Sequence, residues 1–284
     1  MSNFDYFKPQ SLEEVWDLEK KFPGARYIAG GTDLMVKIKN RTIKPRTMIS
    51  LRSVSGLSGI EIGDKVRIGA MTTITDLIEH PELGGIFPVL VQAAKRLGSP
   101  QIRNVGTVGG NLCNCSPCAD TALALLLLDA GVILRNPRGS REIALEEFFI
   151  GPGESCLTGA ELMTEILLEK PASHVRAIFM KKGRVKMDLA VASVGILLEM
   201  DGDVCKKARL AAGSVAPVPL RLKKIEELFA NTVISKEIIQ EAQEIAMNSI
   251  SPITDIRSTA EYRREIVGVY VKRALEKLLE KNEK

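Results

Sequence analysis

The chain has 284 residues, of which 45% are hydrophobic and 26% are charged, so it is long enough for two ordinary domains with packed cores. Its 39 basic and 35 acidic residues are spread along the whole sequence, and the formal net charge of +4 reveals no basic stripe of the kind that grips nucleic acid. The N-terminus has no cationic start followed by an apolar stretch, and the longest apolar run, at 122–128, is far too short to span a bilayer. We therefore expect a cytoplasmic protein that binds neither nucleic acid nor membrane.

The first part of the chain mixes helices and strands. A capping box at Ser11 and Glu14 predicts a helix that ends near Lys21, and a buried strand at 26–29 then leads into the pair Gly30–Gly31. The elements expected after this turn are a helix near residue 34, a strand at 47–51, a hairpin at 59–62 and 66–68, helices at 75–80 and 86–97, an irregular stretch at 98–117 and an apolar helix at 119–130.

Strands and then helices dominate the rest of the chain. The expected strands are 132–135, 162–168, 175–180, 189–200 and 204–212, and the expected helices are 220–229, 235–249 and 259–279. The last strands and helices form a self-contained set, so we place a domain boundary near Pro171 to Val175. The sequence thus predicts an α+β protein with domains at 1–172 and 173–284.

Two glycine turns stand out, AGGTDL at 29–34 and TVGGN at 107–111. A diphosphate brings negative charge that backbone N–H groups in a tight glycine turn satisfy without bulky side chains. Neither turn matches GxGxxG or GxxxxGK[ST], which excludes the usual Rossmann and P-loop readings. Each turn taken alone is more typical of an ordinary loop than of a ligand site.

The surroundings of these turns are more specific. SPQIRNVGTVGGNL at 99–112, AGGTDL at 29–34, SPCADT at 116–121 and DIRSTAEYRR at 255–264 closely resemble the FAD-binding subunit of molybdenum hydroxylases, the relatives of the xanthine dehydrogenase and carbon monoxide dehydrogenase medium subunits. The resemblance covers nearly the whole chain. It implies a two-part FAD-binding domain of the vanillyl-alcohol-oxidase type, with parts at about 1–54 and 55–172, and a C-terminal domain with a small antiparallel sheet and helices.

The same resemblance implies which residues contact the cofactor. These are Tyr27, Ile28, Ala29, Gly30, Gly31, Thr32, Asp33 and Leu34 on one side of the diphosphate, Thr107, Val108, Gly109, Gly110 and Asn111 on the other, then Asp120, Met163 and one of Lys181 and Lys182. Asp120 also has the simpler interpretation of a helix N-cap. Arg103 either contacts phosphate or donates to carbonyls of its own loop.

Five cysteines occur in the chain, and three of them, Cys113, Cys115 and Cys118, lie within six residues. With Cys156 they make the four thiolates that an iron–sulfur cluster usually takes. A structural zinc site is the second interpretation, and small buried thiols with no ligand are the third. Cys205 is excluded because it lies on a strand of the C-terminal domain. The spacing therefore indicates a candidate cluster beside the second glycine turn.

The resemblance implies an electron-transfer role. Electrons taken by a molybdenum cofactor on a molybdopterin-binding large subunit would pass through a [2Fe–2S] small subunit to the FAD of this chain, and then to NAD or another acceptor. The partners would be separate polypeptides, in a dimer of heterotrimers. Two alternatives are a free-standing flavin-dependent oxidoreductase and a non-catalytic nucleotide-binding protein. The substrate is set by the molybdenum subunit, and no catalytic side chains are expected on this chain.

Overall fold

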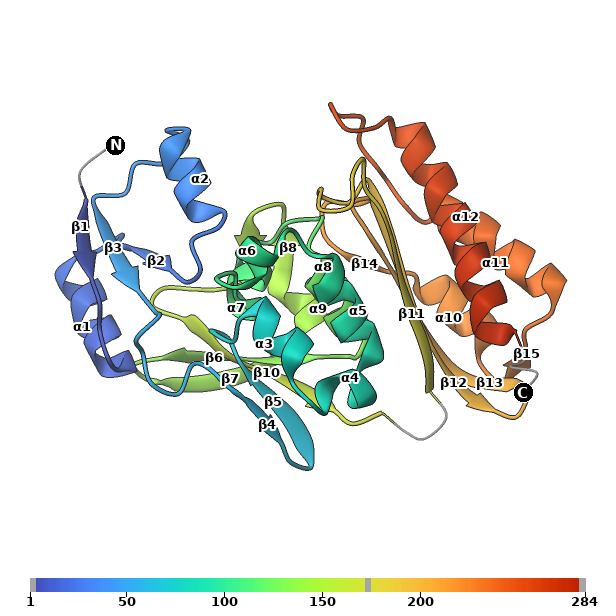
Figure 1. Ribbon diagram of the computed structural model, residues 1–284, viewed down its shortest axis with the longest axis horizontal. Coiled ribbons are helices and arrows are strands. Elements are labelled where there is room, and N and C mark those ends of the chain that lie inside the picture. The colour runs from blue at the N-terminus through green and yellow to red at the C-terminus, as the bar shows by residue number, and fades with distance from the viewer. Residues whose placement is uncertain (1–3, 172–174, 281–284) are drawn as a thin grey trace. The chain divides into compact units, whose positions relative to one another are not determined.

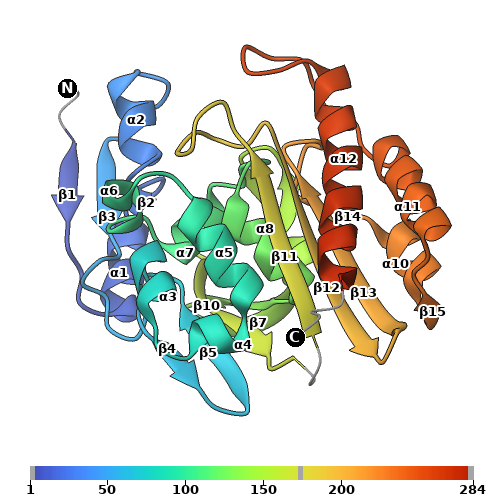
Figure 2. The ribbon, with the colours of Figure 1, turned by 45° about the vertical axis from the view of Figure 1, so that its right-hand side comes forward.

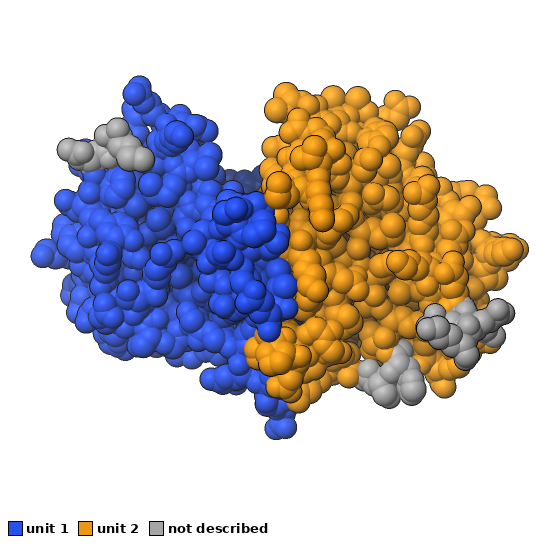
Figure 3. All heavy atoms as spheres, viewed as in Figure 1, with its two compact units in different colours: residues 1–79, 99–114, 130–169 blue, residues 80–98, 115–129, 170–284 orange. Residues whose placement is uncertain are grey.

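A computed structural model describes residues 4–171 and 175–280, and these residues form two compact units that interleave along the chain (Figure 3). The first unit holds the described residues up to Glu79 together with Ser99–Asn114 and Ala130–Glu169, and the second holds His80–Gly98, Cys115–Asp129 and the described residues from Lys170 onward. Two helical segments from the first half of the chain therefore belong to the same compact unit as the C-terminal region. The boundary expected near Pro171 to Val175 falls partly on residues outside the described ranges.

The first unit contains two main sheets, and this arrangement confirms the predicted two-part domain (Figure 1). A parallel sheet has the order β1-β3-β2, with β1 (Asp5–Phe7), β2 (Arg26–Ile28) and the fully buried β3 (Thr47–Ser50). An antiparallel sheet has the order β4-β5-β10-β6-β7, with β4 (Ile60–Ile62), β5 (Lys65–Gly69), β6 (Gly131–Asn136), β7 (Gly139–Ala144) and β10 (Leu162–Glu169). A small pair consists of β8 (Phe149–Gly151) and β9 (Glu154–Ser155).

Helices of the first unit are mostly short. They are α1 (Leu12–Lys21), α2 (Leu34–Lys39), α3 (Ile74–Glu79), α6 (Pro100–Arg103), α7 (Val108–Cys113) and α9 (Leu145–Phe148). The predicted cap of α1 is present, because the Ser11 hydroxyl accepts from the Glu14 N–H at 3.2 Å. Val15 of α1 is fully buried and packs in one cluster with Ile49 and Leu51, which attaches the helix to the parallel sheet.

The second unit is built on an antiparallel sheet in the order β11-β12-β13-β14, with β15 paired to β13. Its strands are β11 (Val175–Lys182), β12 (Ala192–Asp201), β13 (Val204–Gly213), β14 (Leu220–Arg221) and β15 (Thr232–Val233). Its helices are α4 (Leu83–Ile86), α5 (Pro88–Arg96), α8 (Asp120–Leu127), α10 (Lys223–Phe229), α11 (Lys236–Asn248) and α12 (Ala260–Leu279). This sheet with its helices confirms the predicted C-terminal architecture.

Helices cover both faces of this sheet, with α10, α11 and α12 on one side and α5 and α8 on the other (Figures 1 and 2). All eight residues of α8 are buried, and the helix contacts α5 as well as the strands β12 and β13. Gly195 of β12 permits this approach, since a Cβ there would overlap the Leu127 side chain. The apolar run of α8 is thus the core of the second unit and not a membrane segment; no helix in the described ranges is long and apolar enough to cross a bilayer.

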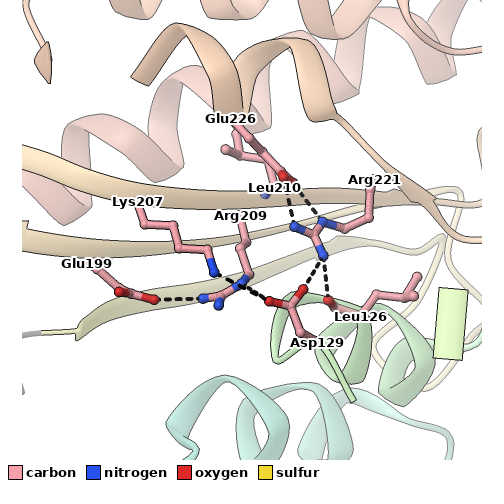
Figure 4. Close-up of polar contacts among 8 residues, drawn as sticks. All are labelled: Leu126, Asp129, Glu199, Lys207, Arg209, Leu210, Arg221 and Glu226. Atoms are coloured by element: carbon pink, nitrogen blue, oxygen red, sulfur yellow. Dashed lines mark hydrogen bonds and ion pairs between the residues drawn. The ribbon is translucent and has the colours of Figure 1, made fainter. Parts of the chain in front are cut away.

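An ion-pair network fastens the C-terminal end of α8 to the sheet (Figure 4). Arg221 donates to both carboxylate oxygens of Glu226 at 2.7 and 2.8 Å and to Asp129 at 2.7 Å. Its fourth bond, at 3.0 Å, goes to the carbonyl of Leu126 at the end of the helix. Arg209 contacts the second oxygen of Asp129 at 2.5 Å. Burial acts to raise the pKa of Asp129, but the hydrogen bonds and charges of Arg221 and Arg209 outweigh it and hold this pKa below its usual range.

Replacing Arg221 with methionine is expected to lower the free energy of unfolding by about 3 kcal/mol at pH 7, because two carboxylates and a helix carbonyl lose a donor in a half-buried setting. The depressed pKa of Asp129 contributes stability that is present above its unfolded value, about 4, and is lost as the pH falls through the folded value. The difference between R221M and the wild type should therefore shrink in acid. Urea titrations at pH 7 and pH 4 measure it, with the exposed Arg138→Met as control; equal losses in both variants would contradict the role of the network.

Three sequence predictions were wrong in detail. The stretch 98–117 contains the short helices α6 and α7, whose caps Ser99 and Thr107 each accept a hydrogen bond from an N–H in the next turn. Strand β7 was missed, because its sequence GSREIA is mostly polar and exposed and carries no alternating pattern. The helix expected at 220–229 begins at Lys223, because Leu220 and Arg221 pair with β13 instead.

Candidate functional site

The two glycine turns lie against each other in the first unit. The first turn connects β2 to α2, and the second forms the start of α7. A Cβ at Gly30 would overlap the carbonyl oxygen of Val105, and a Cβ at Gly110 would lie 3.3 Å from the Cβ of Ala29. The glycines are thus required for the two segments to approach each other, although they are about 80 residues apart in sequence.

The backbone N–H groups of the first turn are available to a ligand. No backbone carbonyl of the described residues accepts a hydrogen bond from the N–H groups of residues 30–33. Gly31 adopts a left-handed φ of 75°, which turns the chain sharply before α2. Asp33, the N-cap of α2, forms no side-chain capping bond. A run of unpaired N–H groups on a glycine turn is the arrangement that binds a diphosphate.

The backbone of the second turn forms hydrogen bonds within the protein. The N–H groups of its last four residues have internal acceptors: Val108 donates to the Thr72 carbonyl at 3.0 Å, Gly109 to the Ala70 carbonyl at 2.8 Å, Gly110 to the Thr107 hydroxyl at 3.1 Å and Asn111 to the Thr107 carbonyl at 2.9 Å. A Cβ at Gly109 would lie 2.6 Å from the Ala70 Cβ, so this glycine serves close packing. The two turns were expected to bind the diphosphate in the same way, through free N–H groups. In the described part of the chain, only the first turn has such a run of free N–H groups.

Several other residues that were expected to contact the cofactor pack in the hydrophobic clusters beside the first turn. Ile28 is buried, Leu34 packs on the cluster that contains it, and Tyr27 packs on the cluster around Val15 and Ile49. These side chains hold β2 and α2 in place on either side of the turn. Thr32 lies within the turn and is half-buried.

Asp120 and Lys181 form a buried ion pair in the second unit. Lys181 Nζ lies 2.6 Å from Asp120 Oδ2, and the two side chains are 4% exposed or less. The same ammonium donates to the Arg96 carbonyl at 2.9 Å, and Arg96 Nη2 donates back to the Lys181 carbonyl at 3.3 Å. Gln92 accepts from the Phe179 N–H at 3.0 Å. Hydrogen bonds at Gln92 and at Arg96 therefore connect α5 to β11.

One oxygen of this pair has no partner. Asp120 Oδ1 is buried and forms no hydrogen bond in the described structure. Burial raises the pKa of Asp120 to about 6, against the attraction of Lys181 and Arg96, which lowers it. Asp120 is the first residue of α8 and the preceding Ala119 occupies the N-cap, so the N-cap interpretation of Asp120 was wrong. A buried carboxylate with an unfilled acceptor fits a ligand that brings an N–H or O–H donor.

The structure distinguishes the two candidate lysines. Lys181 points into the core of the second unit, whereas Lys182, the next residue on β11, is half-buried and points to the other side of the strand. Met163 is buried on β10, where the strand has an irregular register before Glu165. Arg103 ends α6 and is half-buried.

The cysteines are divided between the compact units. Cys113 and Cys156 belong to the first unit, and Cys115 and Cys118 belong to the second. Cys115 is buried with a left-handed φ of 45°, and the Cys156 sulfur lies 4.0 Å from Arg141 Nη2. Within the described ranges, no group of three or more His, Cys, Asp or Glu side chains is placed to hold a metal ion. The cluster stays a prediction from spacing.

Sequence reasoning missed Arg96 and Gln92, which hold the strand that carries Lys181. Both lie on α5, in a stretch expected only to be a helix, and their polar side chains are typical of the solvent face of such a helix. No local pattern marks them, because their partners lie 85 and 87 residues away in the sequence.

Two family models match the chain in succession. "FAD binding domain in molybdopterin dehydrogenase" matches residues 2–171, and "CO dehydrogenase flavoprotein C-terminal domain" matches residues 177–278. Similar proteins include the nicotinate dehydrogenase FAD-subunit of Eubacterium barkeri, 34% identical across 96% of this chain and 95% of that protein. The carbon monoxide dehydrogenase medium chain of Hydrogenophaga pseudoflava is 32% identical across 96% of each chain.

Solved structures agree with these sequence matches. A chain of the Cu,Mo-CO dehydrogenase superposes with a TM-score of 0.94 at 32% identity, covering 98% of this chain and 99% of that one. A chain of quinoline 2-oxidoreductase from Pseudomonas putida 86 superposes with a TM-score of 0.91 at 27% identity, covering 98% and 97%. The likeness therefore extends over both compact units.

Proposed function

This chain belongs to the family of FAD-binding flavoprotein subunits of molybdenum-containing dehydrogenases, and from that premise we propose that it transfers electrons between partner subunits and a soluble acceptor such as NAD. The two family models together account for residues 2–171 and 177–278, and this observation carries the proposal. We propose that the molybdenum and iron–sulfur centres lie on separate polypeptides. The names of relatives as "FAD-subunit" and "medium chain" support this division.

In the proposed cofactor site, the first glycine turn binds the FAD diphosphate through the N–H groups of residues 30–33. The second turn, 107–111, supports the first turn by packing against it. Its side chains would contact the cofactor, because the N–H groups of residues 108–111 already have acceptors within the protein. Bound FAD supplies the exchange between two-electron and one-electron steps. The backbone of the chain binds and orients it, because these donors are fixed before the cofactor arrives.

For Asp120 we propose the cofactor hydrogen bond that the family resemblance implies. Its unpartnered Oδ1 is an acceptor, and Lys181 holds the other oxygen at 2.6 Å. The ion pair would keep the carboxylate in one orientation and would keep its charge available at neutral pH. Of the two lysines, we propose that Lys181 acts at this site, because it is the one that contacts Asp120.

The experiment is purification of the chain from its native cell under gentle conditions. We expect a yellow protein with about one FAD per chain, accompanied by a larger and a smaller polypeptide, and flavin bands that bleach when NADH is added anaerobically. A yellow protein that turns over a small molecule without partners would support a free-standing oxidoreductase. A colourless protein would support a non-catalytic nucleotide-binding protein. An iron assay on the separated chain tests the cysteine cluster.

A further inference from the structure

Two loops of the second unit expose most of the large apolar side chains that this unit leaves in solvent. One loop, 183–191, connects β11 to β12, and the other, 253–258, precedes α12. Of the seven exposed large apolar side chains described in this unit, five lie in these loops: Val185, Met187, Leu189, Ile253 and Ile256. Single exposed apolar residues are common on protein surfaces, but such a concentration is typical of an interface.

A buried arginine joins the two loops. Arg263 of α12 is 2% exposed, and it donates to the Val191 carbonyl and to Asp255 Oδ1, both at 2.7 Å. The same Asp255 oxygen accepts from the N–H groups of Arg257 and Ser258 at 2.8 and 3.2 Å. These bonds place the two loops together at one end of the sheet (Figures 1 and 2), and we call residues 183–191 and 253–258 the loop surface.

The loop surface presents its apolar side chains on an ordered backbone. Ile256 is 92% exposed, and it lies within the turn that Asp255 closes by its hydrogen bonds. In the other loop, Arg184 pairs with Asp188 at 2.7 Å. A segment that is fixed before binding loses little conformational entropy when a partner covers it. The exposed isoleucine is therefore well placed to be an anchor in a protein interface.

The charges around these apolar side chains are mainly basic. Within the loop surface Arg184 and Arg257 pair with Asp188 and Asp255, at 2.7 and 3.5 Å. Lys186 is exposed and forms no ion pair with a described residue. A complementary partner face has an apolar centre and carboxylates that meet the remaining positive charge.

The loop surface also begins next to the proposed cofactor site. The Val191 N–H donates to the Lys182 carbonyl at 2.7 Å, so the base of the first loop directly follows Lys181 on β11. A protein that delivers electrons to the flavin has to bind near the cofactor. We propose that the loop surface binds the iron–sulfur polypeptide of the complex through an apolar face that carries carboxylates; this rests on the proposed function.

The test is purification of the tagged full-length chain from its native cell, with quantification of the polypeptides and FAD that accompany it. Ile256→Asp should lower the amount of the smaller, iron–sulfur polypeptide by about tenfold or more, because it puts a charge at the apolar centre. FAD per chain and the thermal melt should not change. Lys186→Glu should give a smaller loss at low salt, and its difference from the wild type should shrink at high salt.

A matched control and a cross-link identify the occupant. Ile150→Asp changes an isoleucine that is 64% exposed on β8 of the first unit, and it should retain the smaller polypeptide. A photo-reactive benzoylphenylalanine in place of Met187 should cross-link this chain to the smaller polypeptide in the intact complex.

Different outcomes overturn different statements. If Ile256→Asp retains the smaller polypeptide as the wild type does, or if Ile150→Asp loses it equally, the role of the loop surface is wrong and the FAD site stands. A cross-link from position 187 to the larger polypeptide or to a second copy of this chain would also overturn it. So would binding of the wild type to anionic phospholipid vesicles that Ile256→Asp abolishes. If the wild-type chain is colourless and purifies without partners, the proposed function falls, and this assignment falls with it.

Discussion

Replacing Gly30 with alanine is expected to lower the free energy of unfolding by about 3 kcal/mol or more and to abolish FAD binding. The added methyl group would overlap the carbonyl oxygen of Val105, and its next neighbours, the Val105 carbonyl carbon and Gly106 Cα, are also backbone atoms. Backbone atoms in a packed segment have no alternative rotamer. The first turn would have to move away from the loop before α7.

Gly84→Ala is the control for this prediction. Gly84 lies in α4, and nothing lies within 4 Å of a Cβ built there. Alanine is a better helix former than glycine, so this variant should be neutral or slightly more stable. Urea unfolding and FAD titration of both variants provide the measurement. Normal stability and FAD affinity in Gly30→Ala would show that the two turns are not in the contact described.

Replacing Lys181 with methionine is expected to destabilise the second unit by about 3–5 kcal/mol at pH 7, because it leaves Asp120 as an unpaired buried carboxylate. The wild-type pKa of Asp120 is already raised by burial to about 6, and loss of the lysine should raise it further. A group whose folded pKa lies above its unfolded value contributes stability at low pH that is lost as the pH rises through the folded pKa. The variant should therefore approach the wild type near pH 5 and differ most above pH 7.

Lys182→Met is the matched control, since Lys182 is the next residue on β11 but points away from Asp120. It should cost less than about 1 kcal/mol, as is usual for a residue without a buried partner. Adding Asp120→Asn to Lys181→Met removes the unpaired charge and should recover part of the lost stability and flatten its pH dependence. Unfolding measured from pH 5 to pH 8 decides the matter. Equal losses in the two lysine variants, or a loss that does not vary with pH, would contradict the assignment.

Much of the local structure followed from the sequence. The cap of α1 at Ser11, the apolar helix α8 and the strands β11 to β13 lie where their patterns predicted them. Capping and periodicity involve residues within one or two turns of each other, so the information is contained in a short segment. Strand β7 could not be predicted, because its residues form a strand only through pairing with β6.

The second glycine turn shows where sequence reasoning reached its limit. Its GG pair resembles that of the first turn, and both were interpreted as donors to a diphosphate. The structure shows that Gly109 and Gly110 have internal acceptors for their N–H groups, while residues 30–33 have none among the backbone carbonyls of the described chain. The same Gly-Gly pair therefore serves close packing in the second turn, whereas in the first turn its N–H donors have no backbone acceptor among the described residues. Only knowledge of which backbone carbonyl lies opposite distinguishes them.

Several motifs in a fixed order identify the chain as a flavoprotein subunit of the molybdenum hydroxylase family, and reading them needs no coordinates. Which groups remain available to a cofactor depends instead on the tertiary structure. Lys181 contacts Asp120 across 61 residues, and Gln92 accepts from the Phe179 N–H across 87. Such contacts depend on how helices pack on strands far away in the sequence, and hydrogen-bond acceptors become occupied or stay open only when that packing is complete.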